Sequence, residues 1–106
     1  MPRPRRPSYK LYVRLSDQAT RAIQEQADDA GMKTLDLVEK VIVLYLDLTL
    51  DGLRPIHLHA MPNELKLRTY HVSQELGERL ERIRQRMGFA VQDIARAAIT
   101  EHLHIL

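Results

Sequence analysis

The sequence predicts a mostly α-helical protein built from two copies of one strand–helix–helix unit. In both halves an alternating polar and apolar segment precedes a serine suited to start a helix, and these serines, Ser16 and Ser73, lie 57 residues apart. Each serine is followed fifteen residues later by a glycine suited to end a helix, Gly31 or Gly88. A unit this small cannot bury its own apolar face, so we expect the two copies to pack against each other.

Length and composition indicate one compact domain, or two very small units that share one core. The chain has 106 residues, no cysteine and a formal net charge of +2. The lack of cysteine excludes disulfides and thiolate metal sites and suits a reducing compartment. The longest apolar run, residues 41–46, is too short to span a bilayer, and no apolar segment follows the basic N-terminus. We therefore expect a soluble, cytoplasmic protein with no signal peptide and no membrane partner.

Positive charge is concentrated at the start of the chain. Residues 1–8 form an arm rich in proline and arginine, which we expect to be disordered when free. The first 15 residues contain no acidic side chain and five basic ones, Arg3, Arg5, Arg6, Lys10 and Arg14. Such an edge on a more acidic body favours an oriented encounter with a polyanion, and a solvated tail without a partner is the alternative interpretation.

The first copy, residues 9–50, opens with an alternating segment from Lys10 to Leu15 that is typical of a half-buried strand. Its polar face carries Lys10, Tyr12 and Arg14. The following helix has Ser16 as N-cap and ends near Gly31. A second helix is expected from about Thr34, which can cap it, and its apolar circumference predicts burial on several sides. Periodicity alone leaves a strand open for residues 41–43, although the corresponding residues 94–99 favour a helix.

Residues 51–65 include two prolines and are expected to form a linker. The second copy, residues 66–106, has a weaker strand signal, in which Thr69 and His71 face one way and the other face carries Arg68, Tyr70 and Val72. A strongly charged helix follows from Ser73 to Met87, and a second helix is expected from about Val91.

This order of elements, repeated in register, resembles the ribbon-helix-helix family of the Arc, MetJ and CopG repressors. The resemblance covers roughly residues 10–50 and 67–106. It implies that the two strands pair antiparallel into a short two-stranded ribbon that enters the major groove of double-stranded DNA. Family members usually build the ribbon from two subunits. Both halves lie in one chain here, which implies an intramolecular pseudo-dimer similar to the tandem arrangement of TraY-type conjugation proteins.

The resemblance also implies which residues contact DNA. The base-facing row consists of Lys10, Tyr12, Arg14, Thr69 and His71, completed by Leu67. Arg14 suits a bidentate contact to guanine, Thr69 and His71 are less selective, and Leu67 offers only apolar contact. The backbone N–H groups at the start of each second helix would bind phosphates, at Lys33, Thr34, Ala90 and Val91. The arm residues Arg3, Arg5 and Arg6 would lie along a neighbouring backbone or in a minor groove.

Together these features predict a sequence-specific DNA-binding protein, in the simplest case a transcriptional repressor or regulator. A role as accessory protein at a conjugative transfer origin is an alternative, and further copies could bind adjacent sites. An alternative from another class is an antitoxin-like or scaffold module whose apolar second helices bind a protein. The outward strand residues could also be a plain solvent-exposed face. The charged helix of residues 73–87 is best interpreted as a surface with salt bridges, such as Glu78–Arg82.

Other chemistry has little support in the sequence. The histidines at 57 and 59, and at 102 and 104, are two residues apart, so they share no helix face, and no cysteine or carboxylate cluster accompanies them. Acidic pairs such as Asp28–Asp29 lack a neighbouring nucleophile or histidine, and there is no glycine-rich phosphate loop. We therefore expect no enzymatic activity, no metal, no cofactor and no small-molecule ligand.

Overall fold

The computed structural model describes residues 8–49, 53–54, 56 and 65–104. In chain order their elements are β1 (Ser8–Ser16), α1 (Asp17–Asp29), α2 (Thr34–Leu48), β2 (Leu65–Ser73), α3 (Gln74–Met87) and α4 (Val91–His104). The described part of the chain is thus mostly helical with a two-stranded sheet, as the sequence predicts. Most of the expected linker and the arm residues Arg3, Arg5 and Arg6 lie outside the described residues.

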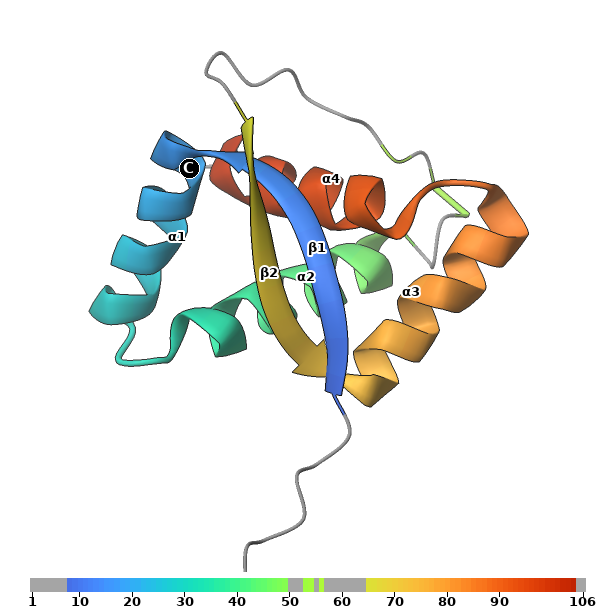
Figure 1. Ribbon diagram of the computed structural model, residues 1–106, viewed down its shortest axis with the longest axis horizontal. Coiled ribbons are helices and arrows are strands. Elements are labelled where there is room, and N and C mark those ends of the chain that lie inside the picture. Colours follow the sequence, from blue (N-terminus) through green and yellow to red (C-terminus); the bar gives the residue numbers. More distant parts are fainter. Residues whose placement is uncertain (1–7, 50–52, 55, 57–64, 105–106) are drawn as a thin grey trace, which may run out of the picture.

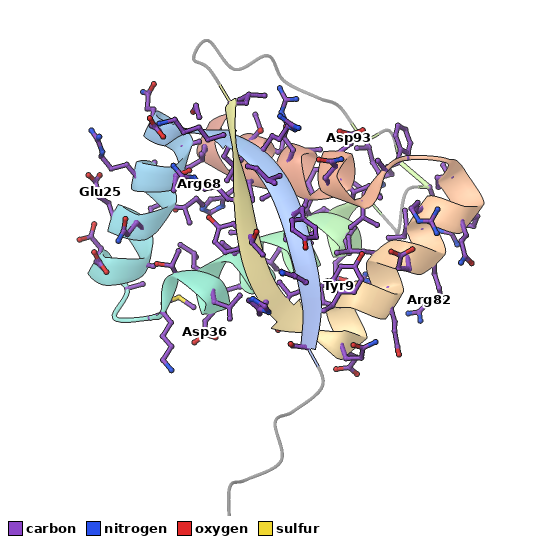
Figure 2. All side chains as sticks on the ribbon, in the orientation of Figure 1. Tyr9, Glu25, Asp36, Arg68, Arg82 and Asp93 are labelled. Atoms are coloured by element: carbon purple, nitrogen blue, oxygen red, sulfur yellow. The ribbon has the colours of Figure 1, made fainter. Side chains whose placement is uncertain are left out.

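The two strands pair antiparallel along their whole length. Figure 1 shows them crossing the middle of the molecule in front of α2 and α4, with α1 and α3 on opposite sides. Tyr9, near the start of β1, lies against α3 (Figure 2). The register joins Tyr12 to Thr69, and these two residues are also equivalent in the 57-residue repeat. The ladder is therefore centred on a pair of equivalent positions.

The first helix of each copy begins as expected, and the second helix of the first copy does not. The hydroxyl oxygen of Ser16 accepts a hydrogen bond from the backbone N–H of Ala19 at 3.1 Å, and that of Ser73 accepts one from the N–H of Leu76 at 3.2 Å. The prediction that Thr34 caps α2 is wrong, because Lys33 has the extended backbone of an N-cap and Thr34 is already helical. The Lys33 carbonyl accepts the first intrahelical bond, from Leu37 N at 3.1 Å. No side-chain cap bond forms there.

The two predicted glycine stops both have positive φ, +67° at Gly31 and +80° at Gly88, but they end their helices differently. At α1 the N–H of Met32 reaches back to the carbonyl of Ala27 at 2.9 Å, the six-to-one bond of a Schellman motif. At α3 the N–H of Gly88 bonds to the Arg84 carbonyl at 2.9 Å, as in the simpler left-handed cap. The first helix therefore ends before its glycine, at Asp29, and α3 runs up to its glycine.

Side chains from both halves form one apolar core. The inward face of β1 is completely buried at Leu11, Val13 and Leu15. The helix α2 contacts α1, α4 and β2, and it buries Leu37, Val38, Val41, Ile42, Tyr45 and Leu46. Leu44 and Leu48 are exposed, so the prediction of burial on several sides is wrong for that part of the helix surface. Residues 41–43 lie inside this helix, so the alternative of a strand is excluded. The helices α2 and α4 pack against each other and against the ribbon.

Candidate functional site

The outward face of the ribbon carries the predicted row of six side chains. All of them are exposed: Lys10, Tyr12, Arg14, Leu67, Thr69 and His71. This orientation follows from the alternation of side chains along each strand, since the intervening residues of β1 are buried in the core. The predicted division of the strands into an inner and an outer face is therefore confirmed.

Strand pairing determines how these side chains are combined. Lys10 lies opposite His71 at one end, Tyr12 opposite Thr69 at the centre, and Arg14 opposite Leu67 at the other end. The Lys10 ammonium lies 5.7 Å from the centroid of the Tyr12 ring, a cation–π distance that keeps its charge on this face. The side chains of Tyr12 and Leu67 are 44% and 53% exposed, so apolar surface accompanies the cations. The two ends of the face are chemically different.

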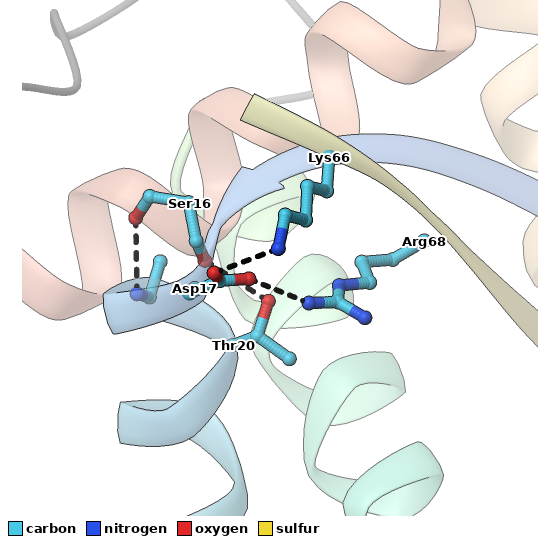
Figure 3. A network of polar contacts seen from close by, with 6 residues as sticks. Ser16, Asp17, Thr20, Lys66 and Arg68 are labelled. Atoms are coloured by element: carbon cyan, nitrogen blue, oxygen red, sulfur yellow. Dashed lines mark hydrogen bonds and ion pairs between the residues drawn. The ribbon is translucent and has the colours of Figure 1, made fainter. Parts of the chain in front are cut away.

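The cations on the outward face of the ribbon differ in their ion pairing from the other cations of the two strands. Neither strand contains an acidic residue. Among the described residues, Lys10 and Arg14 have no ion-pair partner, whereas Lys66 and Arg68 of β2 both bind Asp17 at the start of α1, at 3.0 and 2.9 Å (Figure 3). Hydrogen bonding from Lys66, assisted by Arg68, lowers the pKa of the Asp17 carboxyl. One carboxylate thus offsets two cations of β2 that are not in the outward row, and it leaves the outward face of the ribbon cationic.

The two proposed phosphate-contacting segments lie where the second helices begin. Ala90 and Val91 line a hollow of about 220 Å³ together with Lys10 and Tyr12 of β1. The Ala90 carbonyl accepts from Asp93 N at 3.0 Å and from Ile94 N at 3.1 Å and begins α4, which leaves the N–H groups of Val91 and Gln92 without an intrahelical acceptor. At the start of α2, Lys33 is exposed and Thr34 is partly buried.

Sequence reasoning missed a polar cluster between β1 and α3. The Tyr9 hydroxyl donates to Glu81 Oε1 at 2.8 Å, and Arg84 Nε donates to Glu81 Oε2 at 2.7 Å. Burial and the bond to Glu81 raise the pKa of Tyr9 to about 12, and the bonds from Arg84 and Tyr9 lower the pKa of Glu81. The expected pair Glu78–Arg82 does not form an ion pair in the described structure.

A signal for this cluster was present in the sequence. Gly77 stands inside α3, where glycine is unfavourable, and such a glycine often marks a close approach. Here a Cβ on Gly77 would overlap the Tyr9 ring. The partner could not be named from the sequence, because it comes from the other half of the chain.

The structure shows no candidate metal centre within the described residues, since no three His, Asp or Glu side chains gather there. His102 instead shares a hydrogen bond with Gln26 at 2.7 Å, and burial lowers the pKa of its imidazole. His57, His59 and the side chain of His104 lie outside the described part.

Each helix that the structure describes is too short or too polar to reach across a membrane.

Comparisons of the chain with protein-family models, curated proteins and solved structures found no match. The ribbon face carries exposed cations that have no acidic partner among the described residues, together with exposed apolar groups, and the start of α4 lies beside it.

Proposed function

We propose that this protein binds double-stranded DNA sequence-specifically, with the β1–β2 ribbon inserted in the major groove. The observation that carries this proposal is a difference in ion pairing between the cations of the two strands. Lys66 and Arg68 are paired with Asp17, while Lys10 and Arg14, on the outward face of the ribbon, have no ion-pair partner among the described residues. The major groove is wide enough to admit a two-stranded ribbon and presents distinct hydrogen-bonding patterns to it.

The ribbon is proposed to be that of a tandem ribbon-helix-helix pseudo-dimer. In a true dimer of this kind, equivalent residues of the two strands meet at the two-fold axis. The pairing of Tyr12 with Thr69 supports the same relation within one chain, because these residues are equivalent in the repeat. The contact between α2 and α4, the second helices of the two copies, supports it further.

The proposed base-contacting row consists of Lys10, Tyr12, Arg14, Thr69 and His71. Arg14 is proposed to contact guanine, and Leu67 opposite it to contact a thymine methyl group. Since Lys10 and His71 occupy the other end, the preferred DNA site is expected to be non-palindromic.

Phosphates would be bound at the helix starts, by backbone N–H groups at Lys33, Thr34, Ala90 and Val91. The arm residues Arg3, Arg5 and Arg6 would add contacts to a neighbouring backbone or minor groove. In this proposal the protein is a cytoplasmic transcriptional regulator, and service at a conjugative transfer origin is the alternative role for the same binding activity.

A second candidate function is a protein-interaction module. One observation favours it: Leu44 and Leu48, one turn apart on α2, are 50% and 65% exposed. Exposed leucines at this spacing suit a contact with another protein. The DNA proposal is preferred because it accounts for the row of cations on the ribbon.

Selection of bound duplexes from a random pool at near-physiological salt tests the proposal. Arg14→Ala is expected to weaken binding to the selected duplex by about 1–3 kcal/mol, and to weaken binding to random duplex less, because a bidentate contact to guanine is lost. Arg21→Ala is the matched control, since Arg21 is an exposed arginine that belongs to α1 and not to either strand.

Binding isotherms at several salt concentrations provide the measurement. Equal effects of Arg14→Ala and Arg21→Ala on the selected and random duplexes would exclude base reading by Arg14. A wild-type protein with no duplex preference and no dependence of affinity on salt would exclude DNA binding altogether. A palindromic consensus sequence would contradict the proposal that β1 and β2, with their different outward side chains, contact one DNA site together.

A further inference from the structure

At one end of the ribbon, the ring of Tyr9 packs directly against Gly77 of α3. The tyrosine ring lies where a side chain at position 77 would be, so only glycine permits this contact. Across it, the Tyr9 hydroxyl reaches Glu81 Oε1 at 2.8 Å, one turn further along α3. The end of β1 is thereby joined to the face of α3 that carries Glu81.

Glu81 in turn orients Arg84. Its second carboxylate oxygen, Oε2, accepts from Arg84 Nε at 2.7 Å. This bond occupies Nε, and neither terminal nitrogen of the Arg84 guanidinium has a hydrogen-bonding partner among the described residues. Because both oxygens of Glu81 are occupied, by Tyr9 and by Arg84, the carboxylate cannot rotate away without losing one of these bonds.

Arg84 and the ribbon face border the same hollow. The hollow measures about 220 Å³ and is lined by Tyr9, Lys10, Tyr12, Glu81, Arg84 and residues 90–92. Two cations, Lys10 from β1 and Arg84 from α3, thus flank it on the side of the ribbon that is exposed. Glu81 also lines the hollow, and its charge is offset by its ion pair with Arg84.

The other end of the ribbon has no equivalent of this arrangement. In the 57-residue repeat, Glu81 corresponds to Gln24 and Arg84 corresponds to Ala27, which is completely buried. Tyr9 corresponds to Lys66, which binds Asp17. The cluster therefore exists once, beside the end that carries Lys10 and His71.

We propose that Arg84 is a further DNA-binding residue, which contacts a backbone phosphate next to Lys10, and that Glu81 and Tyr9 are the residues that position it. A guanidinium whose terminal nitrogens have no partner among the described residues suits the oxygens of a phosphodiester. Because the contact exists at one end only, it orients the protein on its DNA site. This inference rests on the proposed function, since it adds a phosphate contact to the same interface.

The test compares Arg84→Gln with Arg82→Gln on a duplex obtained by selection. Both variants remove one positive charge from α3, but Arg82 does not line the hollow that holds Lys10 and Arg84. It lines a neighbouring one, which also includes Tyr9 and Glu81, and points away from the strands (Figure 2). Arg84→Gln is expected to lower the slope of log affinity against log salt by about 0.9, the value for one phosphate contact, and Arg82→Gln to leave the slope unchanged. Phosphate-ethylation interference should lose one position, on one flank only.

A double-mutant cycle tests the positioning residues. Tyr9→Phe removes the hydroxyl that holds Glu81, so it is expected to weaken DNA binding in the wild type and to have no further effect in Arg84→Gln. Far-UV circular dichroism of each variant checks that the fold is retained.

The outcomes separate this inference from the proposed function. Equal salt slopes for Arg84→Gln and wild type, or an unchanged ethylation pattern, would overturn the role of Arg84 while DNA binding stands. Additive effects of Tyr9→Phe and Arg84→Gln would overturn the positioning role of Tyr9. A wild-type protein that binds no duplex would overturn both proposals.

Discussion

At the scale of single residues, Gly77 shows how a long-range contact reverses a local preference. Alanine is favoured over glycine inside a helix by about 1 kcal/mol, and Gly77 lies within α3. Its lack of a side chain is nevertheless required, because Tyr9 from the other half of the chain occupies the space. The glycine therefore serves the packing of β1 and the placement of Glu81 rather than α3 itself.

We expect Gly77→Ala to lower the free energy of unfolding, since the new methyl group must displace the Tyr9 ring and its bond to Glu81. Urea unfolding followed by circular dichroism measures the change. In a Tyr9→Ala background the same substitution should instead stabilise by about 0.5–1 kcal/mol, through helix propensity alone. Destabilisation in both backgrounds would show that Tyr9 is not the cause.

At the scale of elements, the helix N-termini differ in whether a local side-chain cap or a contact with another element stabilises them. Ser73 both caps α3 through its hydroxyl and donates its own N–H to Glu39 of α2 at 2.6 Å. The cap thereby also joins the second copy to the first. Lys33 begins α2 without a side-chain bond, so Thr34 contributes no cap.

These differences predict unequal costs of removing a hydroxyl. Ser73→Ala should lower the free energy of unfolding by about 1 kcal/mol, the usual value for a lost N-cap. Thr34→Ala is the control and should change the free energy of unfolding by less than about 0.5 kcal/mol, because no side-chain cap bond is lost. Equal costs in denaturant unfolding would contradict the assignment of Lys33 as the N-cap.

At the scale of the whole molecule, neither half has a core of its own. The ribbon takes one strand from each half, and α2 packs against α4, so both halves contribute to one apolar cluster. Ile42 and Ile99, equivalent in the repeat, are both fully buried in it. The two copies should therefore fold and unfold together.

Ile42→Ala and Ile99→Ala test this cooperativity. Each should lower the free energy of unfolding by about 2–5 kcal/mol, because buried methyl groups are lost and a cavity remains. Circular dichroism and tyrosine fluorescence should report one common transition in wild type and in both variants. A variant in which one half unfolds before the other would contradict a shared core.

The sequence by itself determined the order of the elements, the two faces of the strands, and the caps at Ser16 and Ser73. These features depend on side-chain periodicity and on bonds between near neighbours, which a sequence displays directly. Only the tertiary structure decided that Tyr12 lies opposite Thr69, that Asp17 neutralises Arg68, and that Tyr9 and Glu81 hold Arg84. Each of these depends on contacts between residues far apart in the chain, whose geometry no local pattern records.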